Sequence, residues 1–149
     1  MKKFVFVLLV LIFGISACSE QSSNEDMAAA THSVVKELEI IDLDLGDGKE
    51  AKNSKRVAVH YTGWLYDESA ADKKGKKFDS SYDRKRPLVF SLGNKDVIQG
   101  WEKGLLKMKV GGKRTLIIPP HMGYGSKGYP PVIPPNAALI FDIELLQAG

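Results

Sequence analysis

One stretch of the sequence has the residue types and spacing of a phosphate-binding loop. Residues 123–128, Gly-Tyr-Gly-Ser-Lys-Gly, match the GxGxxG pattern of dinucleotide-binding sites. That function requires a strand before the motif and a helix that opens inside it. Tyr129-Pro130-Pro131 follows at once and Pro134-Pro135 comes soon after, and proline is incompatible with a helix interior. We therefore interpret the motif as a glycine-rich loop and not as a nucleotide site.

Metal and nucleophilic chemistry depend mostly on histidine, cysteine and serine, and their placement here favours neither. The three histidines, His32, His60 and His121, do not have HExxH spacing, and a single cysteine cannot supply a zinc-binding pair. No GxSxG sequence is present, and Ser80-Ser81 lies beside no histidine. The 18 Asp and Glu residues neither exclude a carboxylate-pair enzyme nor single one out. We expect neither a metal nor a cofactor.

Aromatic and branched apolar residues are unusually frequent in the expected turns and at the expected strand ends. Aromatic residues mostly fill cores, yet residues 124–133 are also dense in Gly and Pro, where a core role is less natural. An apolar loop stiffened by proline suggests the wall of an apolar pocket. The residues concerned are Tyr61, Trp64, Phe78, Trp101, Tyr124, Tyr129, Val132 and Ile133.

The elements that must position these residues follow from the apolar pattern, whose period is mostly two and therefore typical of strands. Five segments are predicted as strands: Val34 to Leu43, Val57 to Thr62, Leu88 to Leu92, Lys113 to Ile118 and Leu139 to Leu145. Val97 to Met108 has apolar spacings of one, three and four residues, which predict a short amphipathic helix with Asp96 as its N-cap. Together these elements predict an α+β domain with the helix packed on one sheet face.

Length and charge limit the remaining possibilities. A chain of 149 residues suits one domain, and its formal net charge of +3 gives no indication of a nucleic-acid partner. Residues 1–17 are typical of a signal peptide, with Lys2 and Lys3 before an apolar run from Phe4 to Phe13. That run is far shorter than the ~20 residues of a membrane-spanning helix. A disordered apolar N-terminus or a short anchor is the alternative.

Ile15-Ser16-Ala17-Cys18 resembles the bacterial lipobox, in which small residues precede the cysteine that is lipidated. The resemblance implies cleavage before Cys18 and three acyl chains on it, a firm membrane anchor where a single chain binds only marginally. Ser19 in place of an Asp favours the periplasmic face of the outer membrane if the host is Gram-negative. Residues 18–33 are predicted as the lipidated cysteine and its polar tether, and residues 34–149 as the folded domain.

Six further motifs resemble the FKBP-type prolyl isomerases, in the order and at close to the spacing of that family. The likeness extends from about Val34 to the C-terminus. Each motif is weak alone, but six in register are highly specific. They are Val59-His60-Tyr61-Thr62-Gly63, Lys77-Phe78-Asp79-Ser80-Ser81, Val97-Ile98-Gln99-Gly100-Trp101, Tyr124-Gly125, Ile133-Pro134-Pro135-Asn136-Ala137 and the segment from Leu139 to Leu146.

The resemblance implies a curved antiparallel sheet wrapped around the short helix, with an apolar pocket between them. By matched position, Trp101 would form the pocket floor under a substrate proline. The hydroxyl of Tyr124 and the backbone N–H of Ile98 would bind substrate carbonyls. Asp79 would be the polar group at the mouth, unless it only caps the turn into Ser80-Ser81. The expected side walls are Tyr61, Phe78, Val97, Ile98 and Phe141.

A flap over the pocket is expected from Tyr129, Val132 and Ile133. Three features depart from the family pattern and are expected to affect substrate preference and the affinity for rapamycin-like macrolides. Leu88, which is expected to contact the substrate, stands where many relatives carry an aromatic residue, and Tyr129 where some carry His. The loop from Tyr66 to Lys77 also looks longer than in the smallest relatives.

The resemblance implies that the protein accelerates cis-trans isomerisation of X-Pro peptide bonds. This activity does not require conventional catalytic residues. Rotation about a peptide bond faces a barrier of about 18–20 kcal/mol, and X-Pro isomers exchange unaided in about 10–100 s. No bond is made or broken, so a pocket that stabilises the twisted amide is sufficient. The expected partners are proline-containing polypeptides that fold after export. A binding module with little isomerase activity and a structural envelope lipoprotein are the alternative functions.

Overall fold

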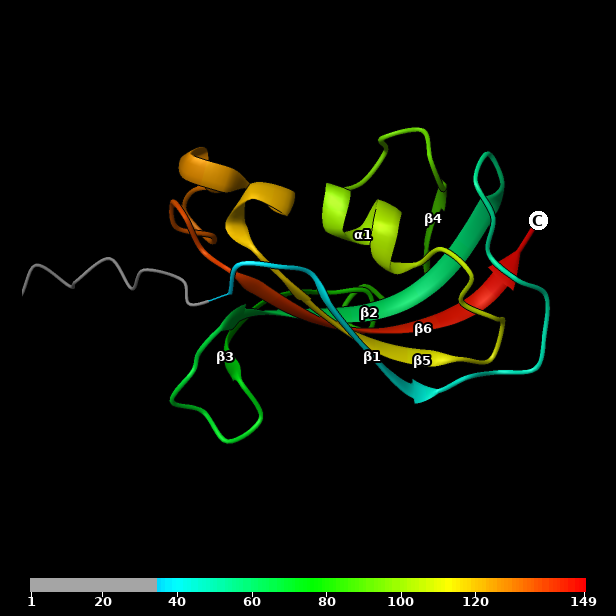
Figure 1. Ribbon diagram of the computed structural model, residues 1–149, viewed down its shortest axis with the longest axis horizontal. Helices are drawn as coiled ribbons and strands as arrows, with labels where there is room; N and C mark the ends of the chain where they lie inside the picture. Colours follow the sequence, from blue (N-terminus) through cyan, green and yellow to red (C-terminus); the bar gives the residue numbers. More distant parts are fainter. Residues whose placement is uncertain (1–34) are drawn as a thin grey trace, which may run out of the picture.

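The computed structural model describes residues 35–149. The predicted signal peptide, Cys18 and the tether lie outside the described residues. Within this part of the chain, no helix is long and apolar enough to cross a membrane. Figure 1 shows the elements, which in chain order are β1 (Glu39–Asp44), β2 (Arg56–Tyr66), β3 (Lys74–Ser80), β4 (Leu88–Ser91), α1 (Gln99–Gly104), β5 (Lys113–Ile118), the 3-10 turns η1 (Pro120–Met122) and η2 (Gly125–Lys127), and β6 (Leu139–Ala148).

The strands form one curved antiparallel sheet, and α1 lies on one of its faces (Figure 1). The strand order is β1-β5-β6-β2-β3, and β4 pairs with the first part of β2, beside β3 on the same edge. The long central strand β2 pairs with β6 along the whole of its other edge, from Val57 opposite Ala148 to Leu65 opposite Leu139. The α+β fold expected from the sequence, a curved antiparallel sheet with one short helix, is therefore confirmed, with six strands where about five were predicted.

The additional strand is β3, whose sequence Lys-Gly-Lys-Lys-Phe-Asp-Ser has no apolar alternation. It is a strand because it pairs with the second half of β2 and not because it buries an apolar face of its own. The first strand is shorter than expected and begins at Glu39, while Val35 packs against Ile117 and Ile140 in a small second cluster.

The helix is also shorter than expected, because α1 ends at Gly104. Leu105 and Met108 are buried, but Leu105 lies in the turn after the helix and Met108 follows that turn, and Lys107 has a positive φ of 64° that a helix cannot continue through. Asp96 does not cap this helix: the N-cap position is Ile98, without a side-chain cap, and the Asp96 carboxylate accepts a hydrogen bond from the Ser91 N–H at 3.0 Å.

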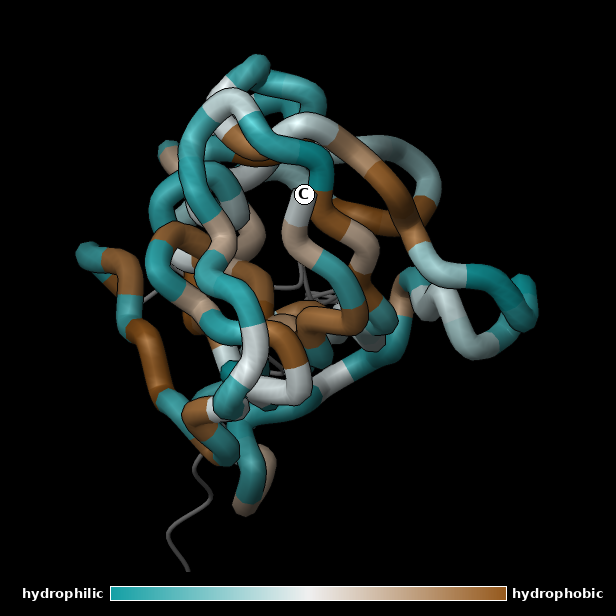
Figure 2. Tube along the Cα trace, turned by 90° about the vertical axis from the view of Figure 1, so that its right-hand side faces the viewer, coloured by the Kyte–Doolittle hydropathy of each residue, from teal (hydrophilic) through white to brown (hydrophobic). Residues whose placement is uncertain are grey.

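The main core lies between α1 and the sheet. Leu105 of the turn after α1, Leu116 and Ile118 of β5, and Leu139 of β6 are fully enclosed in it. The longest hydrophilic stretches lie in the peripheral loops (Figure 2). A core on one side of a curved sheet leaves space where the helix ends and the sheet continues, and the candidate site occupies that space.

Candidate active site

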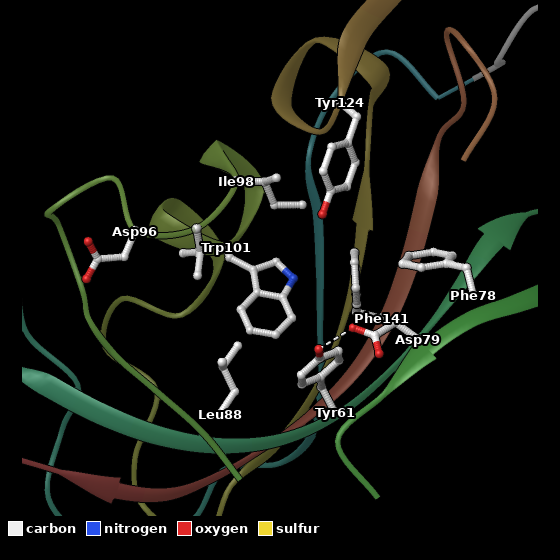
Figure 3. A pocket seen from close by; sticks show the side chains of 10 residues that line it. Tyr61, Phe78, Asp79, Leu88, Asp96, Ile98, Trp101, Tyr124 and Phe141 are labelled. Carbon is white, nitrogen blue, oxygen red and sulfur yellow. Dashed lines mark hydrogen bonds between the residues drawn. The ribbon is translucent and has the colours of Figure 1, made fainter. Parts of the chain in front are cut away.

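A hollow of about 370 Å³ opens between α1, β2, β3, β4 and the turn at Tyr124. Its size is within the range of small-molecule binding sites in proteins. Nine of the twelve pocket residues predicted from the sequence line it, and Asp96 is the tenth lining residue (Figure 3). The nine are Tyr61, Phe78, Asp79, Leu88, Val97, Ile98, Trp101, Tyr124 and Phe141.

Trp101 forms the floor of this hollow and is only 3% exposed. Its position depends on two glycines of α1, because a Cβ on Gly100 or Gly104 would lie 2.5 Å from side-chain atoms of Ile118 or Leu116. Their absent side chains let the helix lie directly on β5. The indole then meets the rings of Tyr61 and Phe141 edge to face, with centroid separations of 5.0 and 5.3 Å. Such contacts fix the orientation of the ring.

A β-bulge shapes the wall opposite the helix. The register of β2 and β3 shifts between Gly63, which pairs with Asp79, and Trp64, which pairs with Lys77. Neighbouring residues of a regular strand point to opposite faces, whereas a bulge can bring two of them to the same face. Phe78 and Asp79 consequently both line the hollow, Phe78 as an apolar wall and Asp79 as a carboxylate (Figure 3).

Gly63 leaves room for that wall. A Cβ at this position would lie 2.6 Å from the Phe141 ring and 2.8 Å from the Phe78 ring. Phe141 stands opposite Gly63 in the β2–β6 register, and its ring meets that of Phe78 edge to face at 5.5 Å. The glycine of the Tyr-Thr-Gly motif therefore provides space for the two aromatic walls.

The polar side of the hollow is a connected group of three side chains. The Tyr61 hydroxyl donates a short hydrogen bond to the Asp79 carboxylate and accepts one from Arg84 Nη2 at 2.7 Å, while Arg84 Nη1 forms an ion pair with Asp79. Burial and the hydrogen bond to Asp79 raise the pKa of Tyr61 to about 12. Burial alone would raise the pKa of Asp79, but the hydrogen bonds from Tyr61 and Arg84 outweigh it and hold that pKa below its ordinary value.

Asp79 therefore does more than cap a turn, because it lies at the mouth of the hollow as an ionised and partnered carboxylate. Arg84 was not predicted as part of the site. The only sequence signal for it is the basic run Arg84-Lys85-Arg86, which resembles an ordinary solvated loop. Its role depends on the fold of the β3–β4 loop, which no local pattern reveals.

Tyr124 and Ile98 both line the hollow, and each has a hydrogen-bond donor without a partner. Within residues 35–149, the Tyr124 hydroxyl has no hydrogen-bond partner and no backbone acceptor is found for the Ile98 N–H. The Tyr124 hydroxyl points into the hollow above the indole (Figure 3). Burial raises the pKa of Tyr124, so this hydroxyl is protonated and able to donate at neutral pH. The indole nitrogen of Trp101, also without a polar partner in the described chain, lies on the side of its ring that faces Phe141 (Figure 3).

The three residues expected in the flap do not line the hollow. Tyr129 and Ile133 exchange backbone hydrogen bonds of 2.8 and 2.9 Å, which close a small loop, and the Tyr129 ring lies 5.7 Å from that of Tyr124. Tyr129 and Val132 are exposed, at 61% and 37%. Ile133 is buried in the main core at 2% exposure, so it holds the base of this loop. The GxGxxG segment contains only the three-residue turn η2, too short for the phosphate-binding helix of that motif.

An apolar hollow floored by an indole and walled by aromatic rings, with unpaired donors at Tyr124 and Ile98 and a paired carboxylate at Asp79, defines a site for a compact apolar group next to a carbonyl. The family model of FKBP-type peptidyl-prolyl cis-trans isomerases matches residues 48–146. The chain therefore belongs to the FKBP-type peptidyl-prolyl cis-trans isomerase family.

Relatives and solved structures agree with this assignment. An FK506-binding protein of Neisseria meningitidis serogroup A is 54% identical over 110 residues, which are 74% of this chain and 94% of the relative. The peptidyl-prolyl cis-trans isomerase Fkbp12 of Drosophila melanogaster is 45% identical over 111 residues, 74% of this chain and 96% of that protein. Among crystal structures, AtFKBP13 has a TM-score of 0.66 at 38% identity, covering 75% of this chain and 93% of its own.

The crystal structure of FkpA from Escherichia coli has a TM-score of 0.64 at 45% identity. The match covers 74% of this chain but 47% of that one, so this chain spans about half the length of FkpA.

Proposed function

We propose that the hollow above Trp101 is the isomerase site and that the protein accelerates X-Pro rotation in exported polypeptides from a lipid anchor at Cys18. The observation that supports the site most strongly is that five of the six separated sequence motifs contribute residues to one open apolar hollow. The proline ring would lie on the indole, and the carbonyl that flanks it would accept hydrogen bonds from the two unpaired donors, Tyr124 and Ile98.

The mechanism needs no group that gains or loses a covalent bond. A planar amide has charge separated between its oxygen and nitrogen, and twisting the C–N bond removes that resonance. The rings of Trp101, Phe78 and Phe141 offer an apolar surface that solvates the planar form less well than water does. A site that fits the twisted geometry better than either planar isomer lowers the barrier in both directions.

Asp79 acts within this site as a fixed charge, paired with Arg84, and not as an acid or base. Its carboxylate is held by Tyr61 and Arg84, and its lowered pKa keeps it ionised through the physiological range. The hydrogen bonds of the Tyr61 hydroxyl with Asp79 and Arg84 fix the direction of that hydroxyl. FK506-like and rapamycin-like macrolides are proposed ligands of the same hollow, because a relative that is 54% identical to this chain over 110 residues is named an FK506-binding protein.

The proposed role in folding can be tested on a denatured protein whose refolding is limited by proline isomerisation. Catalytic amounts of the described domain are expected to speed the slow phase and leave its final amplitude unchanged, since a catalyst does not shift the equilibrium. The Trp101→Ala variant lacks the indole that forms the pocket floor. It serves as the control once circular dichroism has shown that it folds. An unchanged slow phase with the wild-type domain would contradict the folding role.

A further inference from the structure

The β3–β4 loop forms one side of the mouth of the hollow. This loop, residues 81–87, joins two strands whose adjoining residues both line the hollow: Asp79 at the end of β3 and Leu88 at the start of β4. A chain that enters the hollow with its proline on Trp101 must therefore pass close to this loop. The loop residues Arg84, Lys85 and Arg86 are exposed to solvent.

The charges on this side of the mouth do not cancel. Arg84 pairs with Asp79, and Lys77 Nζ lies 3.0 Å from an Asp83 carboxylate oxygen. Within the described part of the chain, no carboxylate oxygen lies within 4.0 Å of the three remaining cations, and all three are exposed. Asp79 and Asp83 are thus both neutralised, while a positive excess remains. The unpaired cations are Lys76, Lys85 and Arg86.

Asp96 is the second carboxylate that lines the hollow, and one of its oxygens accepts a hydrogen bond from the Ser91 N–H. Its neighbour Lys95 is also exposed, so this part of the lining has no net negative charge. Fields between exposed charges act over roughly 8–10 Å before salt screens them, which is the distance of only a few peptide residues.

We propose that the β3–β4 loop makes the site selective for acidic polypeptides, through Asp or Glu residues of the substrate that flank the X-Pro bond. This inference rests on the proposed function of the hollow. The aromatic floor and walls carry no charge and cannot distinguish an acidic from a basic flanking residue. Lys85 and Arg86 supply that discrimination, and they do so mainly by raising the association rate and the affinity.

The test compares peptides that contain one X-Pro bond and differ only in the residues two positions before and two positions after it: Glu, Gln or Lys. Isomerisation is followed by protease-free NMR exchange at low ionic strength. The wild-type protein is expected to show a kcat/KM about three- to tenfold higher for the Glu peptide than for the Gln peptide, with the Lys peptide below both. The preference should shrink in 0.5 M salt, because the charges lie at the surface.

Two charge-reversed variants with the same net charge complete the design. Lys85→Glu/Arg86→Glu changes the mouth, whereas Lys49→Glu/Lys109→Glu changes two exposed loop residues that do not line the hollow. The Glu-to-Gln ratio should fall to one or below in the first variant and persist in the second. Equal rates for all wild-type peptides, or a ratio that the mouth variant keeps, would overturn the inference.

Peptide affinity measured by fluorescence polarisation separates this inference from the proposed function. Failure to accelerate any peptide, together with charge-dependent binding that Lys85→Glu/Arg86→Glu abolishes, would contradict the isomerase site alone. Acceleration of all peptides with charge-independent binding would contradict the acidic preference alone.

Discussion

Trp101 illustrates how single residues of this protein serve the core and the site together. Its indole is 3% exposed and touches the rings of Tyr61, Phe90 and Phe141, yet its face is the floor of an open hollow. Removing a buried tryptophan costs about 3–5 kcal/mol. A loss of activity in Trp101→Ala would therefore mix destabilisation with the loss of the floor, and smaller changes test the site more cleanly.

Tyr124→Phe is such a change. Because the Tyr124 hydroxyl has no partner within residues 35–149, its removal should leave the free energy of unfolding within about 0.5 kcal/mol of wild type. The lost hydrogen bond to the substrate should lower kcat/KM about two- to tenfold, which corresponds to about 0.5–1.5 kcal/mol. Urea denaturation and a peptide assay measure the two effects. A variant that does not fold would show that the hydroxyl is structural.

The raised pKa of Tyr61 can be observed directly. Burial and the hydrogen bond to Asp79 raise this pKa from 10.0 to about 12, so stability from the protonated hydroxyl is complete below pH 10 and is lost as the pH rises toward 12. In a spectrophotometric titration at 295 nm, wild type and Tyr61→Phe should give the same absorbance rise up to about pH 10.5. Above that pH, wild type should form one additional tyrosinate. A difference of one tyrosinate already at pH 10 would contradict the buried hydrogen bond.

At the residue scale, most of the site could be predicted from the sequence, because most of the residues that line the hollow lie within short motifs. Asp96 and Arg84 were missed as site residues: Asp96 was expected as a helix cap, and Arg84 reaches the site only through the path of its loop. Ile133 was expected in the flap, and its apolar side chain instead enters the core at the base of that loop. A motif identifies which residues are needed, but it does not give the direction of each side chain.

At the scale of elements, the contact between α1 and β5 sets the depth of the hollow. Gly100 and Gly104 lie one helical turn apart and together form the face that contacts Ile118 and Leu116. Any side chain there would lift the helix and with it Trp101. The position of this short helix therefore depends on the missing side chains of Gly100 and Gly104, which let it lie close to the sheet.

Gly104→Ala tests this contact. The new Cβ would lie 2.5 Å from Leu116 Cδ1, and Leu116 is fully buried and has no space to move into. Overpacking of this kind costs about 1–3 kcal/mol, more than the ~0.5–1 kcal/mol that alanine gains over glycine in a helix. Urea denaturation should show a net loss of stability and the peptide assay a lower kcat/KM. The neighbouring exposed Lys103→Ala is the control, and equal behaviour of the two variants would contradict the proposed contact.

The strands could be predicted from the sequence where apolar residues on one face of the strand are buried in the core. β2, β4, β5 and β6 have the apolar pattern that identified them. β3 was missed because its lysines and glycine carry no alternation, and only its pairing with β2 makes it a strand. The helix was predicted too long because Leu105 and Met108 continue its apolar spacing beyond its end at Gly104.

At the scale of the whole molecule, the fold forms a site whose proposed mechanism needs no catalytic acid or base. The proposed lipid anchor would determine where in the cell envelope that site acts. Lipidation at Cys18 lies outside the described residues and stays a prediction. In Cys18→Ser, we expect an unprocessed or soluble protein in place of a membrane-bound one, measured by fractionation and by mass spectrometry of the mature N-terminus. Ala28→Ser, in the predicted tether, is the matched control. Unchanged membrane association of Cys18→Ser would contradict the lipobox interpretation.

The most direct measurement is the isomerisation rate of a short X-Pro peptide, followed by a protease that cleaves only the trans form, with and without the protein. We expect a rate that increases in proportion to protein concentration, is unchanged between light and heavy water, and falls in Tyr124→Phe. A wild-type protein that binds the peptide but leaves its isomerisation at the unaided rate of about 0.01–0.1 per second would contradict this expectation.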